Sequence, residues 1–183
     1  MMQDIELYAD LLTDLSQWAH LEVAGLSEEE LAWQPDAEGN NIAITVWHFS
    51  RWLDVVGRVL QGRSPAKELW LVRGWAERTG YNPHGIGEQG LGTVTGYTLQ
   101  EVAAIPRLRA QDLLAYLDQV CETLGTFLRS LPSSEPLQQP VYPGHSRTQQ
   151  RLLQTVFMGS CGHMGEIEAL KAMMKRAGNV KQG

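Results

Sequence analysis

The sequence predicts an all-α fold, an antiparallel four-helix bundle with extra short helices and a glycine-rich loop. Four long segments carry apolar residues at steps of three and four, which is the spacing of one buried helical face. Glycine and proline gather in the segments between them, and the chain contains no internal repeat. Four amphipathic helices bury their apolar faces most simply by packing around a single core.

Two helices are expected at the start of the chain. The first long helix should cover residues 2–25, where apolar residues such as Leu12 recur at helical spacing. A short helix should follow within residues 26–33. Ser27 and Glu30 have the spacing at which a hydroxyl and a carboxylate each cap a free backbone N–H group, which marks a helix N-terminus.

The second long helix is expected to begin at an asparagine N-cap and to end near Gly62. It is apolar over most of its surface, and its length and spacing favour a helix over a strand. Ser64 followed by Pro65 is typical of a helix N-terminus, since proline lacks an N–H that the first turn leaves unpaired anyway. Residues 66–78 are therefore predicted as a third, shorter helix.

A long glycine-rich loop is predicted over residues 79–97, which contain six glycines, and such a loop is either functional or mobile. The letters of residues 85–90 match a dinucleotide-binding pattern. No strand precedes them and no helix N-terminus follows, so we interpret them only as a flexible loop. Thr98 and Glu101 then predict a capping box and a brief helix that ends near Pro106.

The two remaining long helices are expected in the second half of the chain. Residues 109–131 have the clearest amphipathic pattern, and residues 131–144 contain four prolines that predict a connection. Ser146 and Gln149 have capping-box spacing for a last helix over residues 147–176. The residues of this helix expected to face the core are Leu152, Val156, His163, Ile167, Leu170 and Met174.

Composition limits the class of protein. The chain has 183 residues, 43% of them hydrophobic, which suits one domain, expected over residues 1–177 with a flexible tail at residues 178–183. The net charge of −6 offers no basic surface to phosphate backbones, so nucleic acid and membrane are not expected as partners. Two cysteines and an N-terminus without a basic, apolar leader predict a cytoplasmic protein.

His48 and His163 are the residues best suited to chemistry, because each lies near the buried face of an apolar helix. For either one alone, a core histidine with satisfied ring nitrogens is the commoner situation. Glu166 lies one turn beyond His163, and imidazole with carboxylate at such spacing builds metal sites in helical bundles. Glu166 would be a third ligand, the partner that orients His163, or simply a solvated charge.

Three groups of segments carry a resemblance to a known family. Residues 25–31 (GLSEEEL) are followed by a proline and an isoleucine-rich helix with His48, residues 163–167 (HMGEI) lie in the last helix, and residues 68–70 (ELW) and 74–76 (GWA) lie between them. Together these segments resemble the DinB/YfiT-like four-helix bundles. The first is similar to the first half of that family, the second to its closing motif and the third to one of its branches, so the resemblance extends over nearly the whole chain.

The resemblance implies a site for one divalent metal, zinc or nickel, held by three histidines. One comes from the second long helix and two from a His-x-x-x-His pair in the last. His48 and His163 match the first and last positions, but Gly159 stands at the middle position, so the triad is incomplete. The candidates for a third ligand are Glu166, His84, His145 and a water.

Two functions follow as hypotheses. The resemblance implies a metal-dependent thiol S-transferase or hydrolase, in which the metal lowers the pKa of a thiol. His48 and His163 would hold that metal, and Glu166 would orient a ligand or accept a proton. The alternative is a non-catalytic small-molecule-binding or dimeric interaction module that has lost part of the metal site, as Gly159 suggests. If the resemblance were accidental, the two histidines would lie far apart.

Six tryptophans and an apolar second helix indicate more hydrophobic surface than one small bundle buries, so we expect a homodimer. Aromatic residues at helical spacing usually belong to a core, but some of these would also suit the wall of a ligand pocket. The candidates for such a wall are Trp47, Trp52, Trp70 and Trp75. Both cysteines, Cys121 and Cys161, are expected to be packing residues.

Overall fold

The computed structural model describes residues 2–180, without the side chains of residues 2–4, 65, 179 and 180. These residues form helices and connecting loops with no strand, which confirms the predicted all-α fold. The α-helices are α1 (Met2–Val23), α2 (Glu28–Ala32), α3 (Ile42–Leu60), α4 (Leu69–Val72), α5 (Trp75–Thr79), α6 (Leu99–Ala103), α7 (Ala110–Ser130) and α8 (Gln149–Val180). The short 3₁₀ helices are η1 (Pro65–Lys67), η2 (Glu88–Gly90) and η3 (Glu135–Gln138).

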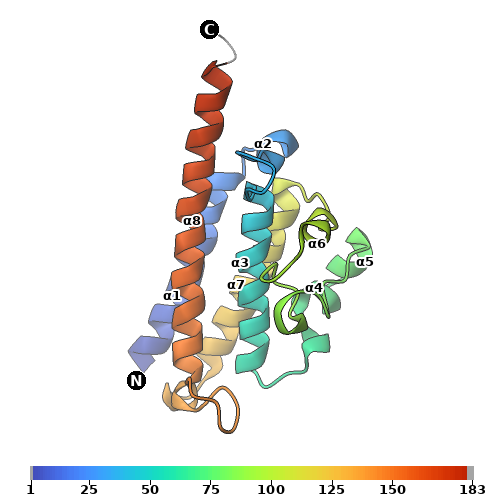
Figure 1. Ribbon diagram of the computed structural model, residues 1–183. Helices are drawn as coiled ribbons and strands as arrows, with labels where there is room; N and C mark the ends of the chain where they lie inside the picture. Colours follow the sequence, from blue (N-terminus) through green and yellow to red (C-terminus); the bar gives the residue numbers. More distant parts are fainter. Residues whose placement is uncertain (1, 181–183) are drawn as a thin grey trace.

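The long helices α1, α3, α7 and α8 form the bundle (Figure 1). α1 and α8 run in one direction and α3 and α7 in the other, so α1 packs antiparallel on α7, and α3 packs antiparallel on α8. The long connection through residues 61–109 joins the parallel pair α3 and α7. It carries α4, α5, α6 and the glycine-rich loop along one side of α3 (Figure 1). The loop therefore lies beside the helix that carries His48.

The core fills the space between the four long helices, where the predicted apolar stripes are buried. The buried stripe of α7 consists of Leu113, Leu117, Val120, Leu124 and Leu128, as its spacing predicts. A second part of the core is aromatic, with the Trp70 ring 5.5 Å from that of Trp47 and 5.0 Å from that of Tyr116. Trp75 stacks on Trp70. These tryptophans are core residues and not the wall of a pocket.

The prediction of one helix over residues 66–78 is wrong, because the backbone is interrupted between η1, α4 and α5. Gly74 separates α4 from α5 with a φ of 75°, a conformation that glycine adopts without strain. The start of α4 is set by α3, since the Asp54 carboxylate accepts hydrogen bonds from the backbone N–H groups of Leu69 (2.9 Å) and Trp70 (3.1 Å). A cap from another helix leaves no mark in the local sequence.

The start of α8 also differs from its prediction, whereas the two capping boxes predicted for α2 and α6 are confirmed. Thr148, not Ser146, provides the N-terminal cap of α8, because its hydroxyl accepts a hydrogen bond from the Arg151 N–H at 3.2 Å. The buried face is rotated slightly from the prediction. Three of the predicted core residues are only half-buried, namely Leu152, His163 and Met174.

The end of α8 lies beyond its predicted position. The helix continues to Val180, so the part of the predicted tail that the structure describes is helical, and residues 181–183 lie outside the described residues. Lys171 joins this part of α8 to the end of α1, because its ammonium group donates to the Glu22 carbonyl (2.8 Å) and carboxylate (2.7 Å).

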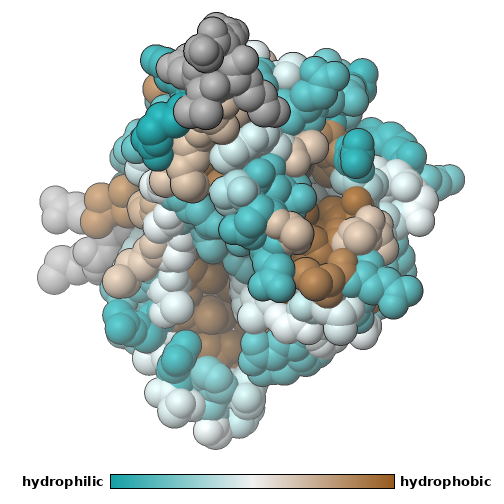
Figure 2. Space-filling model, turned by 45° about the horizontal axis from the view of Figure 1, so that its top comes forward, coloured by the Kyte–Doolittle hydropathy of each residue, from teal (hydrophilic) through white to brown (hydrophobic). Residues whose placement is uncertain are grey.

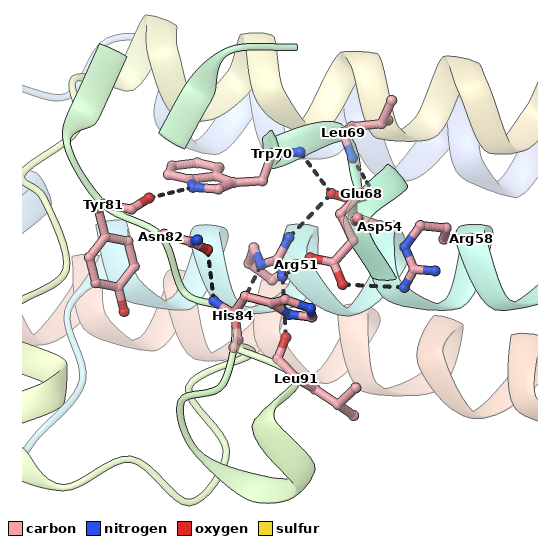
Figure 3. Close-up of polar contacts among 12 residues, drawn as sticks. Arg51, Asp54, Arg58, Glu68, Leu69, Trp70, Tyr81, Asn82, His84 and Leu91 are labelled. Carbon is pink, nitrogen blue, oxygen red and sulfur yellow. Dashed lines mark hydrogen bonds and ion pairs between the residues drawn. The ribbon is translucent and has the colours of Figure 1, made fainter. Parts of the chain in front are cut away.

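A group of charged side chains lies buried between α3, α4 and the glycine-rich loop (Figure 3). This buried charge cluster consists of Arg51, Asp54, Arg58 and Glu68, and it was not predicted from the sequence. Arg51 donates to Glu68 at 2.5 Å and to Asp54 at 3.2 Å. Arg58 donates to the second oxygen of Glu68 at 3.2 Å. Burial alone would lower the pKa of Arg51, but its acidic neighbours raise it, so the guanidinium stays charged.

The glycine-rich loop has a defined, hydrogen-bonded conformation. Its backbone bonds to itself at several points, for example from Glu88 N–H to the Thr95 carbonyl at 2.8 Å. Gly87 has a φ of 71°, and a Cβ there would lie 2.6 Å from the Thr95 carbonyl oxygen, so only glycine fits. Arg51 attaches the loop to α3 by donating to the carbonyls of Gly92 (3.0 Å) and Leu91 (3.2 Å).

Exposed apolar side chains lie in several separate areas of the surface. On the face drawn in Figure 2, hydrophobic residues appear in distinct areas with hydrophilic residues between them. Large apolar side chains that are mostly exposed include Leu21 of α1 (83%) and Met158 of α8 (70%). Among residues 2–180, no helix has an apolar stretch long enough to cross a bilayer.

Replacing Glu68 by alanine is expected to lower the free energy of unfolding by about 3–5 kcal/mol, because it leaves Arg51 and Arg58 buried without their shared carboxylate. Glu6→Ala removes an exposed partner of Arg129 and should cost less than about 1 kcal/mol. Urea unfolding of both variants measures the difference. Equal losses would show that the buried charge cluster does not hold the fold together.

Candidate functional site

His48 of α3 and His163 of α8 face each other across the antiparallel pair of helices. Their ring centroids are 4.6 Å apart and the rings are nearly perpendicular, at 87°. His48 is half-buried, and the side chain of His163 is 28% exposed. These two residues were expected from the sequence to form a pair, and the structure brings them together.

Each of the two rings is held through its Nδ1 atom. Nδ1 of His48 bonds the backbone carbonyl of Thr93 in the glycine-rich loop. Nδ1 of His163 bonds the Glu166 carboxylate at 2.9 Å, one turn further along α8. Because a carbonyl can only accept, His48 carries its proton on Nδ1 and has a lone pair on Nε2. Neither Nε2 atom has a hydrogen-bond partner within residues 2–180.

Glu166 holds the His163 ring in place. One carboxylate oxygen accepts from His163, and the other accepts from the Asn40 side-chain amide at 3.1 Å. The hydrogen bond from His163 is the main reason that the pKa of Glu166 lies below its ordinary value, so the carboxylate is ionised at neutral pH. Of the alternatives that the sequence left open for Glu166, this geometry favours the partner that orients His163.

A pocket of about 110 Å³ lies next to the two histidines. Its walls are formed by Asn40, Ile44, Thr45, His48, Val94, Thr95 and His163. Thr45 is 1% exposed, and its hydroxyl has no hydrogen-bond partner among the described residues. This oxygen is inaccessible to a water-sized molecule, as are the unpartnered Trp47 Nε1 and Arg58 Nε atoms, so the hydroxyl does not contact the pocket space.

The glycine-rich loop supplies the wall that sequence reasoning missed. Val94 lines the pocket with a φ of 74°, and the Thr93 carbonyl before it bonds His48. Thr95 also lines the pocket, and its hydroxyl accepts a hydrogen bond from Trp52 Nε1 at 3.3 Å. None of the four tryptophans predicted to surround a pocket lines this one, and Trp52 bonds one residue of its wall, Thr95. No sequence signal marks a backbone carbonyl as a partner for His48.

The other candidate ligands lie elsewhere. His84 is exposed and is not part of the pocket wall. His145 precedes α8, whose first residue, Gln149, is fourteen residues before His163, which along a helix corresponds to roughly 20 Å. Cys161 is exposed, so the prediction that it packs inside is wrong, whereas Cys121 is buried as predicted. Burial raises the pKa of the Cys121 thiol to about 12, so it is not a reactive thiolate.

Burial lowers the pKa of His48 below its ordinary value of 6.5, and the effect outweighs the Thr93 hydrogen bond. Below that pH the unfolded chain binds a proton at this position that the folded chain does not bind. The free energy of unfolding is therefore expected to fall as the pH drops below 6.5, by at most about 1.4 kcal/mol per pH unit. Glu166 titrates in a lower range and does not interfere.

His48→Gln should reduce this slope between pH 6.5 and 5, whereas His84→Gln, at an exposed position, should leave it unchanged. Chemical denaturation at a series of pH values gives the slopes. An unaltered slope in His48→Gln would contradict the buried, neutral state assigned to this ring.

The comparisons with known proteins agree with this fold. A family model described as the DinB superfamily matches residues 13–167. The fold is similar to the crystal structure of a conserved protein from Enterococcus faecalis, with a TM-score of 0.76 and 18% identity over 92% of this chain and 95% of that chain. At this identity the likeness shows the fold alone. None of the curated proteins matches the chain. Because the family model covers most of its length, this chain belongs to the DinB superfamily.

Proposed function

We propose that the pocket between α3 and α8 binds one divalent metal ion, zinc or nickel, through Nε2 of His48 and Nε2 of His163. The main support is that Nδ1 of each ring already has an acceptor, the Thr93 carbonyl or the Glu166 carboxylate. Metal-ligating histidines typically have such partners, which fix the ring and its tautomer. A centroid separation of 4.6 Å allows both rings to reach one ion, given metal–nitrogen distances of about 2.1 Å.

The residues present fit two of the ligand positions and leave the others to water or a small ligand. Within the described part of the chain, no group of three His, Cys, Asp or Glu side chains is placed to hold a metal. Gly159 lies one turn before His163 and is exposed, and a Cβ built there meets no atom within 4 Å. Because catalytic zinc sites usually have three protein ligands, we expect weak metal affinity and several open positions.

The proposed activity is that of a thiol S-transferase or a hydrolase. A bound divalent cation lowers the pKa of a thiol or water that binds to it, which is the chemistry such an enzyme needs. Glu166 is a positioning residue, since it contacts His163 and is not part of the pocket wall. A space of about 110 Å³ admits only a small reacting group.

The alternative proposal is a non-catalytic module that binds a small molecule or a second copy of the chain. The incomplete set of metal ligands favours it, because His48 and His163 would then bond the ligand directly. Exposed apolar residues such as Leu21 and Met158 provide surface for the expected homodimer under either proposal.

If the pocket binds a metal ion, adding a third histidine should raise the metal affinity. Untagged protein should bind up to one zinc or nickel per chain in isothermal titration calorimetry, and His48→Ala or His163→Ala should abolish binding. Gly159→His should raise the affinity at least about 10-fold, because the added imidazole lies on the same helical face as His163.

Gly162→His is the matched control for this experiment. Gly162 is also exposed on α8, and a Cβ there also meets no atom within 4 Å, but it lies on a different face from His163. Gly162→His should leave the metal affinity unchanged. If neither the wild type nor Gly159→His binds metal, the metal-dependent proposal is wrong and the binding-module alternative takes its place.

The hydroxyl of Thr45 is expected to cost stability, because it is buried without a partner among the described residues. Thr45→Val should leave the free energy of unfolding unchanged or raise it by about 1 kcal/mol, because it removes a buried hydroxyl that has no partner. Ser50→Ala is the control. The Ser50 hydroxyl is also buried on α3 but donates to the Val46 carbonyl at 2.7 Å, so its loss should cost about 1 kcal/mol. Equal destabilisation of the two variants in urea unfolding would show that the Thr45 hydroxyl is already bonded within the protein.

A further inference from the structure

Residues 91–95 form a short segment, here called the strap, that passes along α3 beside the histidine pair. Three side chains of α3, all on one face of the helix, bond to it. His48 bonds the Thr93 carbonyl, Arg51 bonds the carbonyls of residues 91 and 92, and Trp52 bonds the Thr95 hydroxyl. The strap therefore provides both a wall of the pocket and the acceptor that holds the His48 ring.

Arg51 is the strongest of these attachments. Its guanidinium is fully buried and divides its N–H groups between carboxylates and the strap. Nη2 donates to Glu68 at 2.5 Å and to the Leu91 carbonyl at 3.2 Å, while Nε donates to the Gly92 carbonyl at 3.0 Å. The five N–H donors of the guanidinium reach two carbonyls, two carboxylates and the Tyr116 hydroxyl, which are more acceptors than the three donors of an ammonium group can bond.

The strap holds a strained conformation at the pocket. Val94 has a φ of 74°, and a β-branched residue rarely adopts a positive φ. Such strain persists only where the surrounding contacts over-determine the backbone, and it tends to occur at functional sites. Bonds from α3 hold it on both sides, from Arg51 to residue 92 and from Trp52 to residue 95. Backbone bonds within the loop add to them, from Tyr97 N–H to the Val94 carbonyl (2.9 Å) and from Glu88 N–H to the Thr95 carbonyl (2.8 Å).

We propose that Arg51, paired with Glu68, is a positioning residue for the ligand site. By holding the strap it presents the Thr93 carbonyl to Nδ1 of His48, which keeps the Nε2 lone pair free for whatever binds in the pocket. The inference rests on the proposed function only in treating His48 as a ligand-binding group. It applies to a metal and to a directly bound small molecule alike.

The test is the tautomer of His48 in Arg51→Lys, which keeps the buried positive charge but loses the planar set of donors. Nitrogen-15 NMR of the metal-free protein reports which ring nitrogen carries the proton, and loss of signals in His48→Ala identifies them. In the wild type the proton should be on Nδ1. In Arg51→Lys a large part of the population should carry it on Nε2, and zinc affinity should fall by about 10- to 100-fold.

Arg58→Lys is the matched control. Arg58 belongs to the same buried charge cluster and donates to Glu68 and to the Arg63 carbonyl, but it makes no bond to the strap. It should leave the His48 tautomer as in the wild type. An unchanged tautomer in Arg51→Lys, or an equal change in Arg58→Lys, would overturn the proposal and leave Arg51 a purely structural residue.

A second variant decides the question if Arg51→Lys does not fold. Gly92→Ala leaves every charge in place, but its Cβ would lie 2.4 Å from the Pro83 carbonyl oxygen, so the strap must move. Gly80 has a similar positive φ, and a Cβ built there meets no atom within 4 Å, so Gly80→Ala is the control. A change of the His48 tautomer in Gly92→Ala but not in Gly80→Ala supports the proposal. An unchanged tautomer in both variants overturns it. Because this readout needs no metal, it remains valid if the wild type binds none.

Discussion

The bonding of the buried Arg51 guanidinium is the interaction on which the rest of this structure depends. A buried cation is strongly unfavourable unless it is paired and its N–H groups are bonded. In this chain Glu68, Asp54 and two backbone carbonyls meet that requirement, and they come from α3, from the start of α4 and from the glycine-rich loop. Folding must bring these three segments together before the charge can be buried.

The same bonds border the pocket beside the histidine pair. The loop is attached to α3 by Arg51, His48 and Trp52, and its residues Val94 and Thr95 form one side of the pocket. The opposite side comes from α8, where Glu166 holds His163. Each imidazole thus has its own holding group, one a backbone carbonyl and one a carboxylate. Both groups are outside the pocket, so they orient the rings without filling it.

Membership of the DinB superfamily explains the arrangement of the helices but not the chemistry of this chain. Gly159 removes one imidazole from the set that the family resemblance implies, while the holding groups of the two remaining histidines are present. Within the described residues the chain thus has two held imidazoles beside a pocket, without a third protein ligand.

The long helices could be predicted from the sequence because apolar periodicity is a local signal, and His48 and His163 could be singled out because each lies near such a stripe. The bonds between α3 and residues 68, 92 and 93 could not be predicted. They join residues far apart in the chain, and α3 is so apolar that Arg51 appears in the sequence as an interruption of its buried face. The break at Gly74 was missed for a related reason, since Asp54 caps α4 from another helix.

The most direct test of the account is a crystal structure of the untagged protein grown with zinc, with diffraction data collected on both sides of the zinc absorption edge. The account predicts one anomalous peak at about 2.1 Å from Nε2 of both His48 and His163, with the Thr93 and Glu166 bonds to Nδ1 intact. A zinc ion bound at any other place, or a metal-free pocket in which His48 turns its Nε2 away from His163, would contradict it.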